Sequence, residues 1–166
     1  ASNFAVARYS RNLSGQNRLG GMATFRYDEA EPLSGKSTAN TTLTVDGFFR
    51  PTQQINAFWM LSGSKTTGAM EDEGLSGALW AYYSNNWIYL GHVQSFITDE
   101  YNPRVGFVDA TNYLVTSPAV EFKLRPKWLP KFVRQYSPGM TTYFFHYLDD
   151  LSFREGFIDY QPFSLE

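Results

Sequence analysis

The sequence predicts an all-β protein, an antiparallel up-and-down meander in which each strand pairs with the next along the chain. Three observations support this fold class. Stretches of about ten residues alternate apolar and polar side chains, which is the two-residue period of a strand. Gly, Pro, Asn and Asp gather between these stretches and mark turns. No run of about 18 apolar residues occurs, so the sequence contains no candidate membrane helix.

The first part of the chain contributes four predicted strands, at residues 3–11, 17–27, 38–50 and 54–64. Short turns at 12–16 and 51–53 alternate with longer loops at 29–37, which contains Pro32, and at 65–73. In the third strand Leu43 and Val45 alternate with Thr42 and Thr44. This alternation predicts one apolar face and one polar face.

The strongest local signal is a hairpin within residues 74–108. Two strands of about ten residues are predicted to meet at Asn85-Asn86, because paired Asn tolerates the positive φ of a two-residue turn. With this turn Ser84 faces Trp87 and Tyr82 faces Tyr89. The aromatic side chains near the turn then share one face, and they are Trp80, Tyr82, Trp87 and Tyr89.

Strand length and aromatic clustering favour a membrane barrel. A strand of about ten residues rises roughly 33 Å and, tilted by about 40°, projects to roughly 25 Å, the height of the lipid-facing band of such a barrel. Strands of soluble proteins are usually shorter. The aromatic cluster beside the turn is then expected to form the aromatic girdle at one membrane surface. An aromatic-rich soluble core is the alternative.

The predicted connections sort by length. Along the first six strands they run short, long, short, long, short, long, and the last of them is residues 99–110. Every second connection of a meander lies at the same end of the strands. All short turns are therefore predicted at one end and all long loops at the other. Outer-membrane barrels have this asymmetry, and a Greek-key sandwich has no reason to keep it. The sequence therefore predicts part of a transmembrane β-barrel in the outer membrane, in contact with its lipid.

Residues 99–108, DEYNPRVGFV, resemble the signature F/Y-N-P-x-x-G-F-V of an uncharacterised C-terminal domain of bacterial surface proteins. In that family the domain follows a module similar to family-nine carbohydrate-binding modules. The resemblance also covers the segments 8–13, 87–89 and 125–128, and thus most of the chain. Members often carry Arg shortly after the signature, where this chain has Asp109, so no role of that Arg carries over.

The resemblance implies a β-barrel in the outer membrane of a Gram-negative bacterium, of which residues 1–166 form one segment. The implied partners are outer-membrane lipid, other outer-membrane or periplasmic subunits, and a glycan bound through a preceding module. The family has no established catalytic residues. Both ends of the sequence resemble strands that are cut short, which also predicts a segment of a longer chain.

The Asn102-Pro103 step predicts a connection of fixed shape. Pro103 restricts Asn102 to extended conformations, and Gly106 is expected to permit a bend that a Cβ would obstruct. Tyr101 and Phe107 are then expected to pack against the rest of the protein. A structural role is the first interpretation, and contact with a ligand is the alternative.

Three further strands are predicted at 111–124, 139–150 and 157–166, and Pro118 marks an edge, a bulge or a strand end in the first of them. The connection 125–138 holds four of the chain's 14 cationic residues beside Trp128, Phe132 and Tyr136. Two interpretations stay open for this connection. It is either an interfacial element that contacts anionic head groups or an ordinary solvated connection.

The sequence predicts no catalytic residue, cofactor or metal site. It has two His (His92 and His146), no Cys and no catalytic or phosphate-binding motif. A barrel lipase that uses either His is a minor alternative. Acidic clusters at 71–73, 99–100 and 149–150 lack the spacing of a calcium loop. The net charge of −2 without a basic stripe predicts no nucleic-acid partner.

Two function classes remain. The favoured one is a structural or transport-related outer-membrane barrel segment without a catalytic role. The alternative is a soluble carbohydrate-binding β-sandwich, in which Trp59, Trp80 or Trp87 would be exposed stacking platforms.

Overall fold

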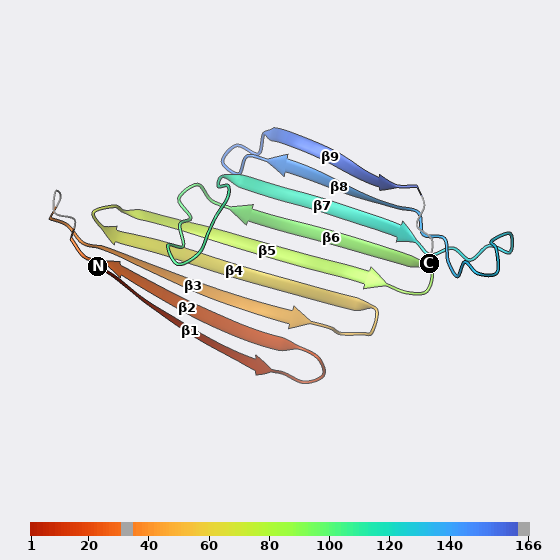
Figure 1. Ribbon diagram of the computed structural model, residues 1–166, viewed down its shortest axis with the longest axis horizontal. Coiled ribbons are helices and arrows are strands. Elements are labelled where there is room, and N and C mark those ends of the chain that lie inside the picture. The colour runs from red at the N-terminus through yellow and green to blue at the C-terminus, as the bar shows by residue number, and fades with distance from the viewer. Residues whose placement is uncertain (31–34, 163–166) are drawn as a thin grey trace.

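The computed structural model describes residues 1–30 and 35–162. Within these residues the regular structure is a nine-stranded antiparallel sheet in the order β1 to β9 (Figure 1), which confirms the predicted all-β meander. The strands are β1 (Ser2–Asn12), β2 (Arg18–Asp28), β3 (Thr38–Phe49), β4 (Ile55–Gly68), β5 (Asp72–Ser84), β6 (Ile88–Ile97), β7 (Tyr113–Phe122), β8 (Gly139–His146) and β9 (Phe153–Gln161). The described part of the chain contains no helix long and apolar enough to cross a membrane. Pro32 and residues 163–166 of the predicted ninth strand lie outside the described residues.

The predicted long loop at 65–73 is wrong. β4 continues to Gly68 and β5 begins at Asp72, so only residues 69–71 connect them. Lys65 pairs with Glu73 across the two strands, and its Nζ lies 2.7 Å from the Glu73 Oε2. The polar composition of these strand ends made them resemble a loop.

The predicted sorting of connections by length is therefore also wrong. The connections 13–17, 50–54 and 85–87 lie at one end of the strands, and the connection 123–138 lies at the same end. At the opposite end of the strands, the short connection 69–71 lies between the longer connections 29–37 and 98–112. Connection lengths consequently give no support to a barrel, and any such support has to come from the two faces of the sheet.

The hairpin of β5 and β6 has a different turn from the predicted one. Ser84 pairs with Tyr89, and Tyr82 pairs with Gly91, so the predicted register is wrong by two residues. The side-chain oxygen of Asn85 accepts hydrogen bonds from the backbone N–H groups of Trp87 (2.8 Å) and Ile88 (2.9 Å). This side-chain cap closes the turn without a positive φ at either Asn. A shift of two residues keeps each side chain on its predicted face.

Pro118 does not end β7. It lies within the strand and pairs with His92 of β6, while the pairing of β7 with β8 is interrupted between Thr116 and Ala119. The Thr142 hydroxyl donates a hydrogen bond of 3.3 Å to the Pro118 carbonyl in this gap. The missing N–H of proline thus accounts for a local interruption inside the sheet.

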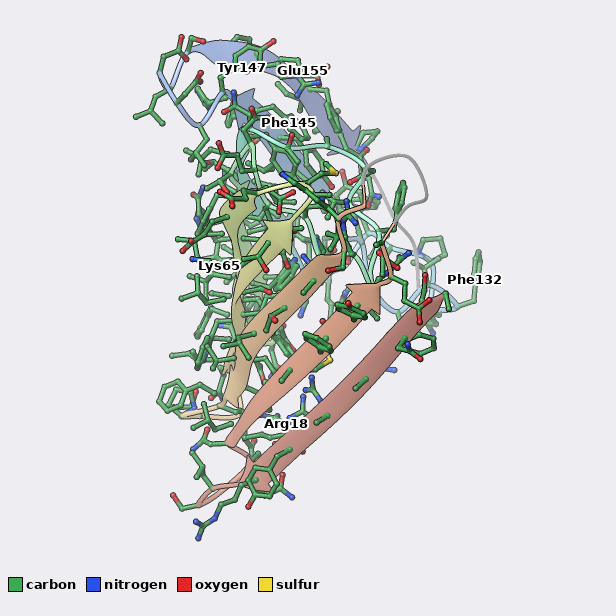
Figure 2. All side chains as sticks on the ribbon, turned by 90° about the vertical axis from the view of Figure 1, so that its left-hand side faces the viewer. Arg18, Lys65, Phe132, Phe145, Tyr147 and Glu155 are labelled. Carbon is green, nitrogen blue, oxygen red and sulfur yellow. The ribbon has the colours of Figure 1, made fainter. Side chains whose placement is uncertain are left out.

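The sheet is curved, and its two faces have opposite character (Figure 2). The buried side chains of the described residues comprise thirteen polar ones and two apolar ones, Tyr101 and Val115. On the concave face the register aligns the buried polar residues Thr24, Thr42, Thr44, Ser62, Ser64 and Thr66. On the convex face it aligns exposed apolar residues, among them Leu43 (61% exposed), Leu61 (46%) and Leu75 (51%). This distribution reverses the usual one of soluble proteins.

An ion pair on the concave face ties the edge strand β1 to β3 across β2. The Arg8 Nη2 lies 2.9 and 2.8 Å from the two carboxylate oxygens of Asp46. The pair passes over Gly20, where a Cβ would lie 3.0 Å from the nearer of these oxygens.

The Arg8→Met variant is expected to lose at most about 1 kcal/mol of unfolding free energy, because partly exposed ion pairs contribute little. Urea unfolding at low and high salt measures this effect, and the difference from the parent should shrink at high salt. A loss that is independent of salt would contradict an electrostatic role for Arg8.

Candidate functional site: the loop on the concave face

The connection between β6 and β7, residues 98–112, lies across the concave face of the sheet and is called here the inward loop. In Figure 1 it crosses in front of β5 and β4. Its first turn is anchored to β5, because the Thr98 N–H donates to the Leu75 carbonyl (2.9 Å). Tyr101 is only 8% exposed, and Asn102 to Arg104 are half-buried. The predicted fixed shape of this connection is therefore seen in its packing.

The Tyr101 hydroxyl reaches the centre of the polar face. It donates a hydrogen bond of 2.8 Å to the Ser62 Oγ, and the Ser62 Oγ is 2.7 Å from the Thr44 Oγ1. Ser62 is 1% exposed. A chain of three hydroxyl groups thus links the inward loop to β4 and β3.

Asn40 of β3 binds the backbone of the inward loop. Its Nδ2 donates to the Asn102 carbonyl (2.8 Å) and to the Thr66 Oγ1 (2.9 Å), and its Oδ1 accepts from the Arg104 N–H (3.1 Å). The Asn102 N–H in turn donates to the Ser64 Oγ (2.8 Å). Asn40 is 1% exposed, so its side-chain amide has no access to water. The hydrogen bonds to the loop and to Thr66 replace those that water would otherwise supply. The small polar residues of β3 and β4 are therefore the docking surface of the loop.

Arg104 extends this contact to β2. Its Nη1 lies 3.5 Å from an Asp28 oxygen, and the Arg26 Nε lies 3.1 Å from the other Asp28 oxygen. The Arg26 Nη1 also donates to the Arg104 carbonyl (3.0 Å). With its contacts to β3, β4 and β5, the inward loop connects four neighbouring strands and braces the curvature of the sheet.

Gly74 of β5 is the residue that lets the inward loop approach the sheet. A Cβ at this position would overlap with the backbone N and Cα of Tyr101. The sequence was expected to need Gly106 for a bend that a Cβ would obstruct, but the nearest atom to a Cβ there would be 3.5 Å away, an ordinary contact. It also placed Phe107 in a packed position, and Phe107 is 90% exposed. Both of these expectations are wrong.

The Tyr101→Phe variant is expected to lose about 1 kcal/mol of unfolding free energy, because it removes one buried hydrogen bond and keeps the packed ring. The Ser62 hydroxyl keeps Thr44 as a partner, which limits the loss. Urea unfolding of the parent and the variant measures the difference. An unchanged midpoint would show that the hydroxyl chain does not hold the loop.

Aromatic side chains occupy the other end of the concave face. Trp80, Tyr82 and Tyr89 line an open groove there together with Ser117 and Tyr143. The ring centroids of Tyr82 and Tyr89 are 5.9 Å apart. The register places these three residues on the concave face, away from the exposed leucines of the convex face.

The three tryptophans proposed as stacking platforms do not form one surface. Trp80 lies on the concave face, and Trp59 lies on the convex face beside Gly47. Trp87 lies in the β5–β6 turn and is 71% exposed. A flat glycan therefore could not contact Trp59 and Trp80 together.

The connection 123–138 is ordered by its own contacts. Leu124 and Tyr136 form an antiparallel bridge, and the Lys123 Nζ donates to the Ser84 Oγ (2.7 Å). It projects beyond the sheet in Figure 1, and Figure 2 shows its exposed Phe132 on the concave side. Phe132 is 88% exposed. Trp128 is 72% exposed as well, and both interpretations of this connection stay open.

The histidines lie apart, His92 in β6 and His146 in β8, with β7 between them. Within the described residues neither forms a hydrogen bond with a serine or a carboxylate, and the buried His146 Nδ1 has no partner. The same residues contain no group of three metal-binding side chains. Acidic residues have other contacts: Asp72 accepts a hydrogen bond from Asn102, and the Ser152 N–H lowers the pKa of Asp150 in the β8–β9 turn.

The sequence was compared with models of protein families, with curated proteins and with solved structures, and none of them matched. The class that the fold and the site define is a curved antiparallel sheet with exposed leucines on its convex face and with a concave face that is polar under an inward-folded loop and aromatic at its other end. The resemblance to the uncharacterised surface-protein domain stays a prediction.

Proposed function

We propose that residues 1–166 form a segment of a transmembrane β-barrel in the outer membrane, with a structural or transport-related role. The convex face contacts lipid, and the concave face borders an aqueous lumen. The observation that carries this proposal is the reversed burial: small polar side chains are packed inside, and large apolar side chains are exposed outside. An outward apolar band and a polar interior are the pattern of membrane barrels.

The exposed apolar residues form a continuous surface. On the convex face the register places Leu43 and Leu75 on either side of Gly63, and Val45 opposite Leu61, two residues away along β4. Within the described residues no segment covers them. Burying one such side chain is worth about 1.5–3 kcal/mol, and soluble monomers rarely expose apolar patches larger than a few hundred Å². A bilayer supplies the apolar surroundings that this face lacks in water.

The soluble sandwich has less support. A sandwich buries an apolar face of one sheet against a second sheet. The one sheet found in the described residues has its apolar face on the convex side, whereas the inward loop covers part of the concave side. The alternative would need a second layer on the convex side, and the described residues supply none.

In the proposed barrel the inward loop narrows the lumen. Tyr101 and Arg104 are held against the wall by Ser62, Asn40 and Asp28, so the constriction is fixed by buried hydrogen bonds. Loops that fold into the lumen are a recurrent feature of larger barrels. The loop would limit the size of a solute and would also brace the wall.

Fractionation of cells that express the protein tests the proposal. The protein should stay with the outer-membrane fraction after washing with alkaline carbonate, and it should require detergent for extraction. Recovery of a monodisperse protein from the soluble fraction without detergent would overturn the proposal and favour the sandwich.

A further inference from the structure

Both edges of the sheet are open. Within residues 1–30 and 35–162, β1 pairs only with β2, β9 pairs only with β8, and β1 and β9 do not contact each other. Every residue of these two strands is exposed, whereas each strand from β2 to β8 has buried or half-buried residues. Each edge therefore presents a row of backbone N–H and C=O groups without a strand partner.

Both edges lack three features that commonly block pairing, although each carries charged side chains. β1 and β9 contain no proline and no lysine, and they extend over 11 and 9 residues. Short strands, proline and inward lysine are the common means of protecting an edge. In both strands apolar residues continue the convex surface, with Tyr9 on β1 and Ile158 and Tyr160 on β9. Both edges therefore resemble interior strands that lack one neighbour.

The directions of the strands restrict what can pair there. Nine strands alternate in direction, so β1 and β9 run the same way, as their arrows show in Figure 1. Direct closure of β1 onto β9 would be parallel. A second copy placed around a common pore axis would also bring its β1 parallel to β9. Antiparallel closure needs a strand of the opposite direction at each edge, and bacterial membrane barrels close with antiparallel strands.

We propose that β1 and β9 are pairing surfaces for antiparallel strands from polypeptide outside residues 1–166, and that these strands are odd in number. This inference rests on the proposed barrel and specifies the kind of partner that completes it. The backbone of each edge would supply the hydrogen bonds, and the alternation of the added strands would match the polar concave and apolar convex faces.

Photo-crosslinking in the native membrane tests the inference. A benzophenone amino acid replaces Ala5 or Tyr9 on β1, and Gly156 or Tyr160 on β9, one position at a time. Mass spectrometry then identifies the crosslinked residue. At both edges, moving the probe forward by four residues should move the crosslinked residue backward along its own chain. A probe at the exposed turn residue Asn86 gives the background.

Three results would overturn the inference. The first is a crosslink between β1 and β9. The second is a crosslinked residue that moves forward along its chain when the probe moves forward. The third is a crosslinking yield at both edges no higher than that of the Asn86 probe. The failure of the proposed function is distinguishable, because a protein that leaves the membrane in carbonate contradicts the barrel. A protein that stays in the membrane and gives a parallel shift contradicts this inference and leaves the proposed barrel standing.

Discussion

The Leu61→Lys variant is expected to lose about 2–4 kcal/mol of unfolding free energy when the protein is folded in a bilayer. Leu61 lies near the middle of β4 on the convex face and is 46% exposed. In the proposed orientation it faces the centre of the hydrocarbon layer, where an ammonium group has no water. Urea titration of protein reconstituted in lipid vesicles, followed by tryptophan fluorescence, measures the loss.

The Ala78→Lys variant is the matched control. Ala78 lies on the neighbouring strand at the same height, because it pairs with Met60, but it faces the concave side. Its lysine would enter the aqueous lumen, and the expected loss is below about 1 kcal/mol. Equal losses for the two variants would show that the two faces have the same surroundings, which contradicts the proposed orientation.

The Gly74→Ala variant is expected to displace the inward loop from the sheet. The added Cβ would overlap with backbone atoms of Tyr101, which cannot rotate away as a side chain can. Gly74 is itself fixed by its pairing with Ser64. Overpacking of this kind costs about 1–3 kcal/mol. The displaced loop also loses the hydrogen bond that the Asn40 Nδ2 donates to the Asn102 carbonyl and the one that the Asn102 N–H donates to the Ser64 Oγ. Hydrogen exchange of the Asn102 and Arg104 amides measures the displacement, and both should exchange faster.

The Gly63→Ala variant serves as its control. Gly63 lies on the convex face of β4, where the nearest atom to a Cβ would be a flexible Leu75 methyl group at 3.4 Å. Exchange in the inward loop should stay at the parent rate. The Asn40→Ala variant should also accelerate exchange at Arg104, because it removes the acceptor of that amide without adding bulk. Unchanged exchange in Gly74→Ala would refute the close approach of loop and sheet.

The strands and their faces could be predicted from the sequence because both follow from local alternation. Leu43 and Val45 against Thr42 and Thr44 gave the two faces of β3 correctly. The hairpin register could not be fixed in this way, because a shift of two residues leaves the alternation unchanged. There the Asn85 side chain closed the turn by accepting hydrogen bonds from the Trp87 and Ile88 N–H groups.

The site was only partly predictable. Pro103 indicated a loop of fixed shape, but the partners of this loop are distant in sequence. Asn40 is 64 residues from Arg104, and Ser62 is 39 residues from Tyr101. Alternation also does not tell which face of a strand is concave, and so the sequence could not place Trp80 on the same face as the inward loop. Nothing in the sequence around Gly74 indicates that the backbone of Tyr101 lies against it.

The central claim is that the convex face contacts lipid and the concave face contacts water. The sequence contains no cysteine, so single-cysteine variants can carry one fluorescent label each. Labels at Leu43 and Leu61 on the convex face, and at Ala78 and Ser95 on the concave face, are compared in vesicles. Lipid-attached quenchers should reduce the emission only of the labels at positions 43 and 61. Water-soluble quenchers should reduce the emission only of the labels at positions 78 and 95. The reverse pattern, or equal access of water-soluble quenchers to all four labels, would contradict the central claim.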